Sequence, residues 1–285
     1  MATQRFLLGL ASLVGLLVAY TWVSNRLSQP EVIPPTQAIA EAFVDLIAGP
    51  RQQPAADQPV HMGHHAHSSD HVEVLLQQGV TLQASLAITT ARVLFGLVVG
   101  APIGILLGLL MGLSRRVNDY AHPLYVLVRS IPPLALITYI MLWLGHREPH
   151  RLIPIVYAVA TTMVIPTYHG LRDVASTYVV AGRSLGAKGW LLIQKVLLPA
   201  ASPAVLTGLR YAVAIAWMTA VGSEMLMAEN GMGNLIVGGG MWASRLQTRS
   251  DPAVVIVGIL ALAIAGWVMD VGARVLTIRL TRWAR

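Results

Sequence analysis

Five histidines within a short polar stretch form one group of side chains that could do chemistry. Met62 and Asp70 lie in the same stretch, and its histidines are His61, His64, His65, His67 and His71. Neutral imidazoles beside a thioether and a carboxylate can bind Zn²⁺, Cu²⁺ or Ni²⁺, but the spacing does not match a defined tetrahedral site. Two interpretations stay open: a metal-binding segment, or a solvated insertion whose histidines titrate near about 6.5.

Charged residues inside long apolar stretches form a second such group. Arg92, Arg129 and Arg210 interrupt these stretches, and Glu224 is a carboxylate within one of them. Because a charge at the centre of a bilayer costs at least about 2.5–3.5 kcal/mol, each arginine should have a partner, face a cavity or extend to the membrane surface. Glu224 is a natural ion-pair partner for one of them, and the sequence leaves open which one.

Motifs for catalysis do not occur in this sequence. It contains no G-x-x-x-x-G-K-[ST] phosphate loop, and no Ser/His/Asp set or carboxylate pair stands on a polar segment. We therefore expect a protein that is not an enzyme and holds no cofactor of its own.

The elements that carry these residues are membrane spans. Of the 285 residues, 55% are apolar and 12% are charged, and the mean hydropathy is +0.63. The net charge of +7 comes from basic residues at the ends of apolar runs, which favours lipid and cytosol over nucleic acid as the neighbour. The apolar runs cover about residues 6–23, 85–111, 123–144, 152–169, 196–228 and 253–273. Most are close to the roughly 20 residues that cross a bilayer, so we predict an all-α membrane protein with six transmembrane helices.

The basic residues indicate the orientation. If the N-terminus is cytoplasmic, more of them fall on the cytoplasmic side, as the positive-inside rule requires. Those residues are Arg115, Arg116, Arg172, Arg183, Lys188, Lys195, Arg279, Arg282 and Arg285. The prediction is that both termini are cytoplasmic.

The predicted organisation has four parts. Residues 1–24 form the first transmembrane helix, and 25–80 an extracytoplasmic connection with an amphipathic helix at 36–47 and the histidine tract. Residues 81–275 form the core with a cytoplasmic loop at 172–195, and 276–285 a basic cytoplasmic tail.

A ladder of glycines marks the second predicted span. They recur every four residues at Gly96, Gly100, Gly104, Gly108 and Gly112. Such spacing lets another helix approach closely. Tight packing and a contact that slides during function are both compatible with it.

The loop from Tyr178 to Pro199 is cationic and punctuated by glycines between two apolar runs. It resembles the EAA loop of ATP-binding-cassette (ABC) importer permeases. Ala181 and Gly182 take the two Ala positions, Gly186 the invariant Gly, Val196 the Ile position, and Leu198 and Pro199 the closing pair. Val180 stands where the family has Glu, so an ionic contact of that Glu is not expected here.

The resemblance extends over roughly residues 80–275. The stretches SLAITTARVLFGLVVGAPIGILLGLLMG, RSIPPLALITYIMLWLG and PAVLTGLRYAVAIAWMTAVGSEM are similar to permeases of nitrate, taurine and alkanesulfonate importers. This implies a type I importer fold with a cytoplasmic coupling helix, in a bacterial cytoplasmic membrane. It implies as partners a second permease copy, two cytoplasmic ATPase subunits that bind ATP–Mg, and a periplasmic binding protein.

The resemblance also implies roles for individual residues. ATPase coupling is expected at Ala181, Gly182, Arg183, Gly186, Ala187, Leu198 and Pro199, with a small residue required at Gly186. The expected residues of the translocation pathway are Arg129, Pro132, Pro133, Arg210 and Glu224. The function expected is passage of a small anion such as a sulfonate, taurine or nitrate. The alternative is a metal-handling or metal-sensing membrane protein that uses the histidine tract.

Overall fold

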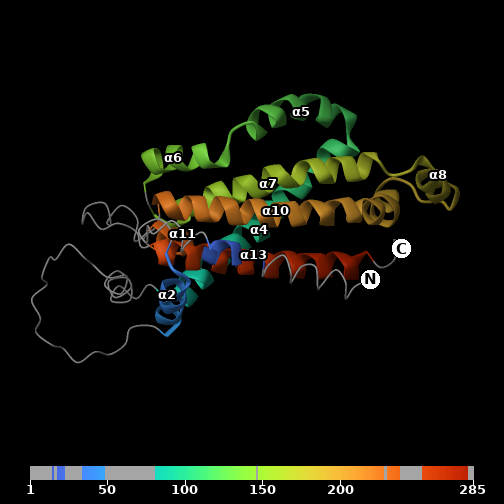
Figure 1. Ribbon diagram of the computed structural model, residues 1–285. Helices are drawn as coiled ribbons and strands as arrows, with labels where there is room; N and C mark the ends of the chain where they lie inside the picture. The colour runs from blue at the N-terminus through green and yellow to red at the C-terminus, as the bar shows by residue number, and fades with distance from the viewer. Residues whose placement is uncertain are drawn as a thin grey trace, which may run out of the picture. The chain divides into compact units, whose positions relative to one another are not determined.

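The computed structural model describes residues 15, 18–22, 34–48, 81–145, 147–227, 230–237 and 252–281. These residues form helices and turns, and none of them is in a β-strand, which confirms the all-α prediction for this part of the chain (Figure 1). The helices are α2 (Thr36–Ala48), α4 (Leu82–Leu113), α5 (Arg115–Arg129), α6 (Pro133–Leu144), α7 (Glu148–Arg172), α8 (Ser176–Ser184), α9 (Trp190–Leu192), the π-helix η1 (Ile193–Leu197), α10 (Leu198–Met227), α11 (Met232–Val237) and α13 (Pro252–Leu280).

The chain forms two compact units, and both α4 and α13 contribute to each. The first unit contains residues 1–85 and 235–261, and the second contains 86–234 and 262–285. In the first unit, the amphipathic helix expected at 36–47 is present as α2, which buries Ala42 and Leu46. The second unit carries the features described below.

Four helical segments of the described chain are long and apolar enough to cross a membrane. They are α4, α7, Trp190–Leu226 and α13, and the pair α5 and α6 is a fifth candidate with a bend of 79° between its halves. The span predicted at 123–144 is therefore formed by two helices and not by one, because the helix breaks before Pro132 and Pro133, neither of which has a backbone N–H to donate. Of the six predicted spans, the first lies mostly outside the described residues.

The glycine ladder of α4 packs directly on α7. A Cβ atom added at any of its five glycines would overlap a residue of α7. The pairs are Gly96–Ile155, Gly100–Val159, Gly104–Met163, Gly108–Thr167 and Gly112–Leu171. Tight packing, the first of the two interpretations, is thus confirmed.

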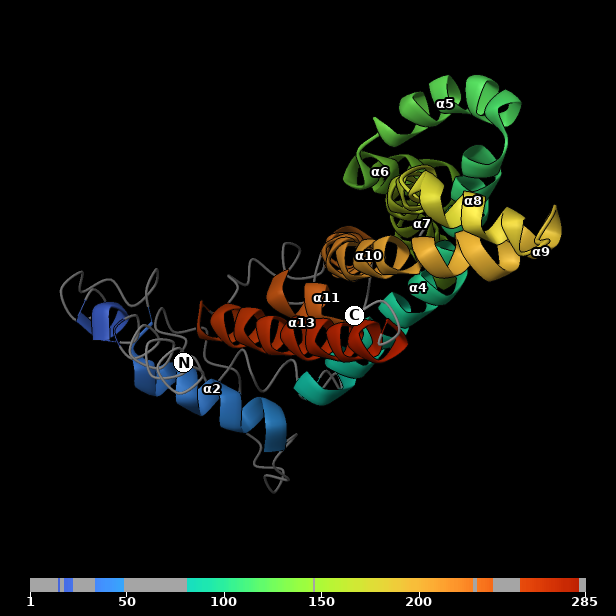
Figure 2. The same cartoon turned by 90° about the vertical axis from the view of Figure 1, so that its right-hand side faces the viewer.

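The same pairs show that α4 and α7 run in the same direction, because the residue numbers rise together. Two neighbouring parallel helices require the chain between them to return across their length, so α5 and α6 together make one crossing. In contrast, α10 runs antiparallel to α7, since Gly170 meets Ala204 whereas Gly208 meets Pro166. Both views show α7 and α10 side by side (Figures 1 and 2).

The break between α5 and α6 is supported by a side chain of α7. The Tyr157 hydroxyl donates to the carbonyl oxygens of Val128, at 2.5 Å, and Ile131, at 3.0 Å. Val128 is the residue whose carbonyl would bond the missing N–H of Pro132 in a continuous helix. The broken backbone is therefore satisfied by protein, as a break inside a membrane requires.

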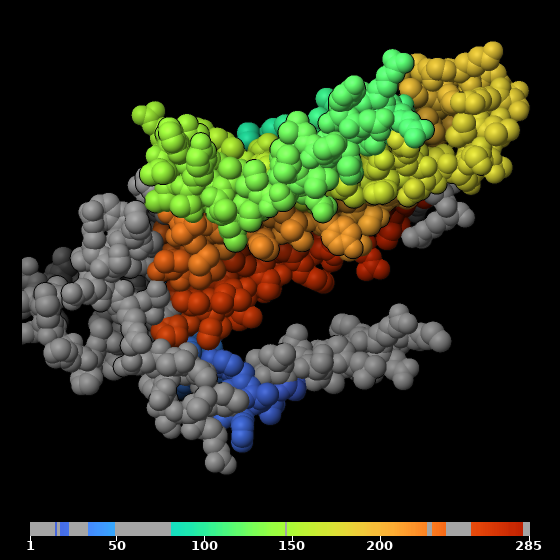
Figure 3. All heavy atoms as spheres, turned by 90° about the horizontal axis from the view of Figure 1, so that it is seen from above, coloured from blue at the N-terminus to red at the C-terminus, as the bar shows by residue number. Residues whose placement is uncertain are grey.

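An apolar core joins α4, α7, α10 and α13 within the second unit. Its most buried members include Val93, Ile155, Met163, Ala212 and Ala216. The space-filling view shows α5 and α6 along one side of these helices and α8 beyond the end of α7 (Figure 3).

Candidate functional site

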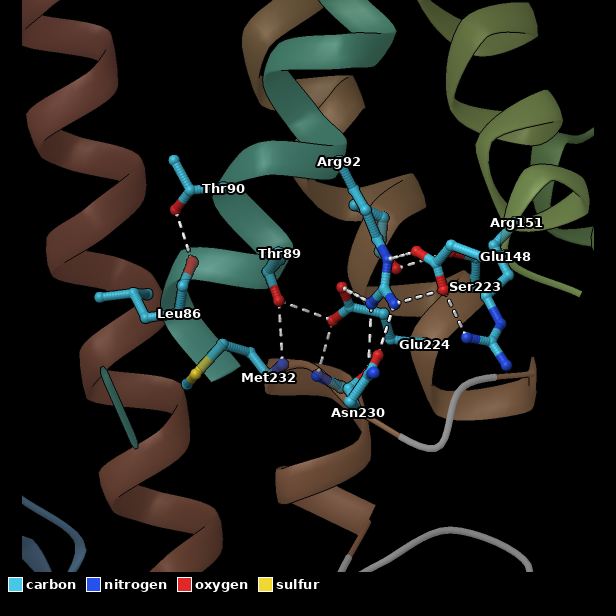
Figure 4. A network of polar contacts seen from close by, with 12 residues as sticks. Leu86, Thr89, Thr90, Arg92, Glu148, Arg151, Ser223, Glu224, Asn230 and Met232 are labelled. Carbon is cyan, nitrogen blue, oxygen red and sulfur yellow. Dashed lines mark hydrogen bonds and ion pairs between the residues drawn. The ribbon is translucent and has the colours of Figure 1, made fainter. Parts of the chain in front are cut away.

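Arg92 of α4 is the centre of a buried polar network (Figure 4). Its guanidinium makes five hydrogen bonds, as many as it has N–H groups. Nε and Nη2 bind the two carboxylate oxygens of Glu148 at 2.6 and 2.9 Å, and Nη1 binds Oε1 of Glu224 at 2.7 Å. The remaining two bonds go to the backbone and side-chain oxygens of Asn230. One side chain thus connects α4 with α7, α10 and the turn before α11.

Glu224 completes the network from α10. Its Oε2 accepts from the Thr89 hydroxyl at 2.8 Å and from the Gly233 N–H at 3.0 Å. The backbone of Gly231, with φ of +105°, lies over this carboxylate, and a Cβ at Gly231 would come within 2.5 Å of it. The buried charge of Glu224 is therefore neutralised by Arg92 and hydrogen-bonded on both oxygens.

The network answers the question of which arginine pairs with Glu224. Arg92 does, and it shares its charge with Glu148, which also binds Arg151 at 2.6 Å. Glu148 and Arg151 were not predicted, although a Glu and an Arg three residues apart at the start of an apolar run are a visible signal. The network lies where α7 begins, roughly 37 Å of helix from the end that leads to α8.

A cavity of about 860 Å³ opens between α5, α6, α7 and α10. It falls within the usual size range of small-molecule sites. Its lining residues are Tyr125, Arg129, Pro133, Ala158, Thr161, Thr162, Ile165, Pro166, Pro203, Ala204, Thr207, Gly208, Tyr211 and Ile215. Arg129 is the one charged residue among them, so the wall is apolar with hydroxyls and a single cation.

Three threonines of this wall use their hydroxyl hydrogens within their own helices. Thr161 donates to Tyr157, Thr162 to Ala158, and Thr207 to Pro203, in each case to a backbone carbonyl. The Tyr125 hydroxyl likewise donates to the carbonyl of Thr161 at 2.8 Å. As oriented, these groups offer oxygen lone pairs to the cavity, whereas Arg129 offers donors and positive charge.

The five residues expected along the pathway do not meet in one place. Arg129 and Pro133 line the cavity, and Pro132 caps the start of α6 next to them. Arg210 instead binds Asp270 of α13 at 3.0 Å, and Glu224 lies in the network around Arg92. Asp270 was missed, although a carboxylate inside the last apolar run is itself a signal for a partner.

The loop expected to couple to an ATPase is helix α8 followed by a turn. The turn has the two hydrogen bonds of a Schellman motif, from Gly186 N–H to Arg183 O at 3.0 Å and from Ala187 N–H to Gly182 O at 2.9 Å. Gly186 has φ of +86°, and a Cβ there would meet nothing within 4 Å. Within this chain, glycine is therefore favoured at this position by the backbone angle, and the space around it is open. The need for a small residue against an ATPase stays a prediction.

The close approach occurs at Gly182 instead. A Cβ at this buried position would lie 2.9 Å from Val196 Cγ2 and 3.1 Å from Leu192 Cδ1. Ala181 and Arg183, its neighbours, are exposed, while Ala187 is buried. Leu198 and Pro199 begin α10 directly after the π-helix. Gly182 thus packs α8 against α9 and η1, which lead into α10.

The surface of this segment is apolar and basic. Tyr178, Val180, Leu185 and Trp190 are all more than 60% exposed, and Arg183 and Lys188 are exposed beside them. The histidine tract, His61 to His71, lies outside the described residues, so its metal-binding role stays a prediction.

Comparisons with known proteins agree with this architecture. Residues 100–282 match the family described as the binding-protein-dependent transport system inner membrane component. The chain is 28% identical over 282 residues to the taurine transport system permease protein TauC of Escherichia coli (strain K12), covering 99% of this chain and 91% of that protein. It is 35% identical over 198 residues to the putative aliphatic sulfonates transport permease protein SsuC of the same organism, covering 70% and 73% of the two chains.

A solved structure supports the fold independently. A chain of the MetNI methionine ABC transporter, in its inward-facing conformations, superposes with a TM-score of 0.54 at 20% identity, covering 76% of this chain and all of that one. Together with the family match, this shows that the chain belongs to the binding-protein-dependent transport system inner membrane components, the multi-pass permease subunits of ABC importers, which are not themselves catalytic.

Proposed function

We propose that the chain forms half of a translocation pathway for a small solute with an anionic group, such as taurine, another sulfonate, nitrate or bicarbonate. The observation that carries this proposal is the cavity of about 860 Å³ with Arg129 as the one charged residue of its wall. A lone cation in a water-filled cavity lowers the energy of an anion within the membrane. Taurine and aliphatic sulfonates, for which the relatives are named, each carry a sulfonate group of this charge.

The segment from α8 to α9 is the proposed contact with the ATPase. Its exposed Tyr178, Leu185 and Trp190 offer apolar area for a groove, and Arg183 and Lys188 suit an acidic rim. Val180 replaces the Glu of the family pattern, so this contact depends on packing more than on an ion pair. ATP and Mg²⁺ would be bound by the ATPase subunits.

The second half of the pathway is proposed to be an identical copy of the chain. Leu142 and Trp143 of α6 are 81% and 71% exposed, so this helix has apolar surface available for a partner. Both termini are proposed to face the cytoplasm of a bacterial cell, with a binding protein that delivers the solute from outside.

Reconstitution tests the proposal. The chain is placed in vesicles with its ATPase subunits and binding protein, and taurine, an alkanesulfonate, nitrate and bicarbonate are supplied one at a time. The expected result is ATP-dependent uptake of at least one solute, lost when the binding protein is omitted. The proposal is contradicted if none is taken up and loaded binding protein leaves ATP hydrolysis unchanged.

A further inference from the structure

A second charged element lies beside the cavity, on α10 and α13. Nη2 of Arg210 donates to both carboxylate oxygens of Asp270 at 3.0 Å, and Nε donates to Oδ1 at 3.1 Å. The two side chains are 38% and 45% exposed. The ion pair is therefore well formed but open on one side.

The depth of this pair decides what its open side can face. Helix α13 is roughly 43 Å long, and Asp270 lies within its apolar run at 253–273, about 5 Å before the end of that run. Charged groups inside an apolar run turn toward protein or water, since contact with lipid is costly. The open side of Arg210 and Asp270 is thus expected to face water or another protein surface.

The neighbouring residues indicate that the open side of the ion pair faces water of the translocation pathway and not another protein surface. The pair borders a small pocket of about 280 Å³, lined also by Thr207, Tyr211 and Ala214. Thr207 and Tyr211 line the large cavity as well. The two hollows thus share these two side chains, and Tyr211 is itself 68% exposed.

Arg129 and Arg210 lie at different levels along α7. Arg129 precedes the break held by Tyr157, whereas Arg210 follows Gly208, which packs on Pro166. Because α10 runs antiparallel to α7, Arg210 lies roughly 10 Å nearer to the α8 end than Tyr157 and the break do. A solute that moves from Arg129 toward α8 would meet Arg210 next.

We propose that Arg210 is a second contact for the transported anion, and that the Asp270 carboxylate occupies it while no anion is present. This deepens the proposed function and rests on it. An arriving anion would exchange with the carboxylate at the guanidinium, so the arginine is never left without a negative partner. Competition by Asp270 would also keep the anion from binding too tightly to leave, a condition for conduction.

Cysteine labelling tests the environment of the pair, without requiring transport. The chain contains no cysteine, so Ala214→Cys introduces the one thiol of this chain into the purified permease. The probes are two water-soluble methanethiosulfonates, one with a sulfonate and one with a trimethylammonium group. We expect the sulfonate reagent to react about tenfold faster than the cationic one, because Arg210 attracts it. The advantage should grow in Ala214→Cys with Asp270→Asn and disappear with Arg210→Gln.

Val268→Cys is the matched control, on α13 and exposed, but turned about 200° from Asp270. It should show no preference for the sulfonate reagent. The proposal is overturned if Ala214→Cys reacts with neither reagent, since the pair then does not face water. It is also overturned if Arg210→Gln leaves the preference unchanged.

A charge exchange separates an anion contact from a structural ion pair. Arg210→Asp combined with Asp270→Arg keeps opposite charges together but moves the cation to α13. In a complex whose unaltered form transports, we expect assembly to persist and uptake to fall about tenfold.

Full uptake by this double variant would assign the pair to structure alone. If the exchanged pair does not assemble, Arg210→Gln with unchanged solute KM overturns the proposal instead. Failure of the unaltered complex to transport would count against the proposed function, not against this inference.

Discussion

Arg92 and Glu224, 132 positions apart in the sequence, form a buried ion pair with 2.7 Å between Nη1 and Oε1. Their side chains are 3% and 0% exposed. Because Arg92 also binds Glu148 and Asn230, this pair determines how the starts of α4 and α7 meet the end of α10. The network has no net charge, because two cations face two carboxylates: Arg92, Arg151, Glu148 and Glu224. This neutralisation lowers the free-energy cost of placing the charges inside a membrane protein.

Arg92→Gln should destabilise the permease more than Glu224→Gln does. The first change leaves two carboxylates without their shared cation, at a cost of about 3–5 kcal/mol, whereas the second leaves Arg92 paired with Glu148. Unfolding of the purified protein in detergent measures both. The double variant should lose less stability than the sum of the two, and strict additivity would contradict a direct pair.

Gly186→Asn should preserve coupling to the ATPase better than Gly186→Val. The position has φ of +86° and open space, so the side chain's tolerance of this angle matters more than its size. The measurement is ATP hydrolysis stimulated by loaded binding protein in the reconstituted complex. Equal loss in both variants would show that the angle is not the constraint.

Gly182→Ala should weaken the same coupling, and Val196→Ala should restore it. The added Cβ lies 2.9 Å from Val196 Cγ2, and the second change removes that atom. Overpacking of this kind typically costs about 1–3 kcal/mol. Val196→Ala alone serves as the control, and a double variant no better than Gly182→Ala would contradict the packing argument.

Tyr157→Phe should loosen the break between α5 and α6 while it keeps the ring. The lost hydroxyl leaves the exposed carbonyls of Val128 and Ile131 without this donor, at a cost of about 0.5–1.5 kcal/mol. Hydrogen exchange of residues 126–136 is expected to speed up. Tyr139→Phe, whose ring is on the exposed side of α6, is the control and should leave exchange there unchanged.

Arg129→Gln should reduce anion uptake roughly ten- to a hundredfold in reconstituted vesicles. The estimate corresponds to one charge-assisted hydrogen bond of about 1.5–3 kcal/mol. Arg129→Lys keeps the charge in the cavity wall and should retain much of the uptake. Normal transport by the glutamine variant, with the complex assembled, removes Arg129 from the pathway.

Several features could be predicted from the sequence because they depend on local properties of the chain. Apolar length indicates membrane crossing, and glycines every fourth residue indicate a helix contact. The EAA-like pattern located the loop that α8 and α9 form. Each of these features follows from backbone geometry or from the transfer free energy of side chains. It can therefore be predicted without knowing which helices pack together.

The choice of partners was decided only by the tertiary structure. From the sequence, any of three arginines could pair with Glu224. Arg92 binds it because α4 and α7 pack in parallel, so that the starts of both helices lie at the same end of α10. Arg210 is instead next to Asp270, and Tyr157 supplies the hydroxyl at the break. Ion pairs and hydrogen bonds act over a few ångströms, whereas these residues are 26 to 132 positions apart, so helix packing determines which of them meet.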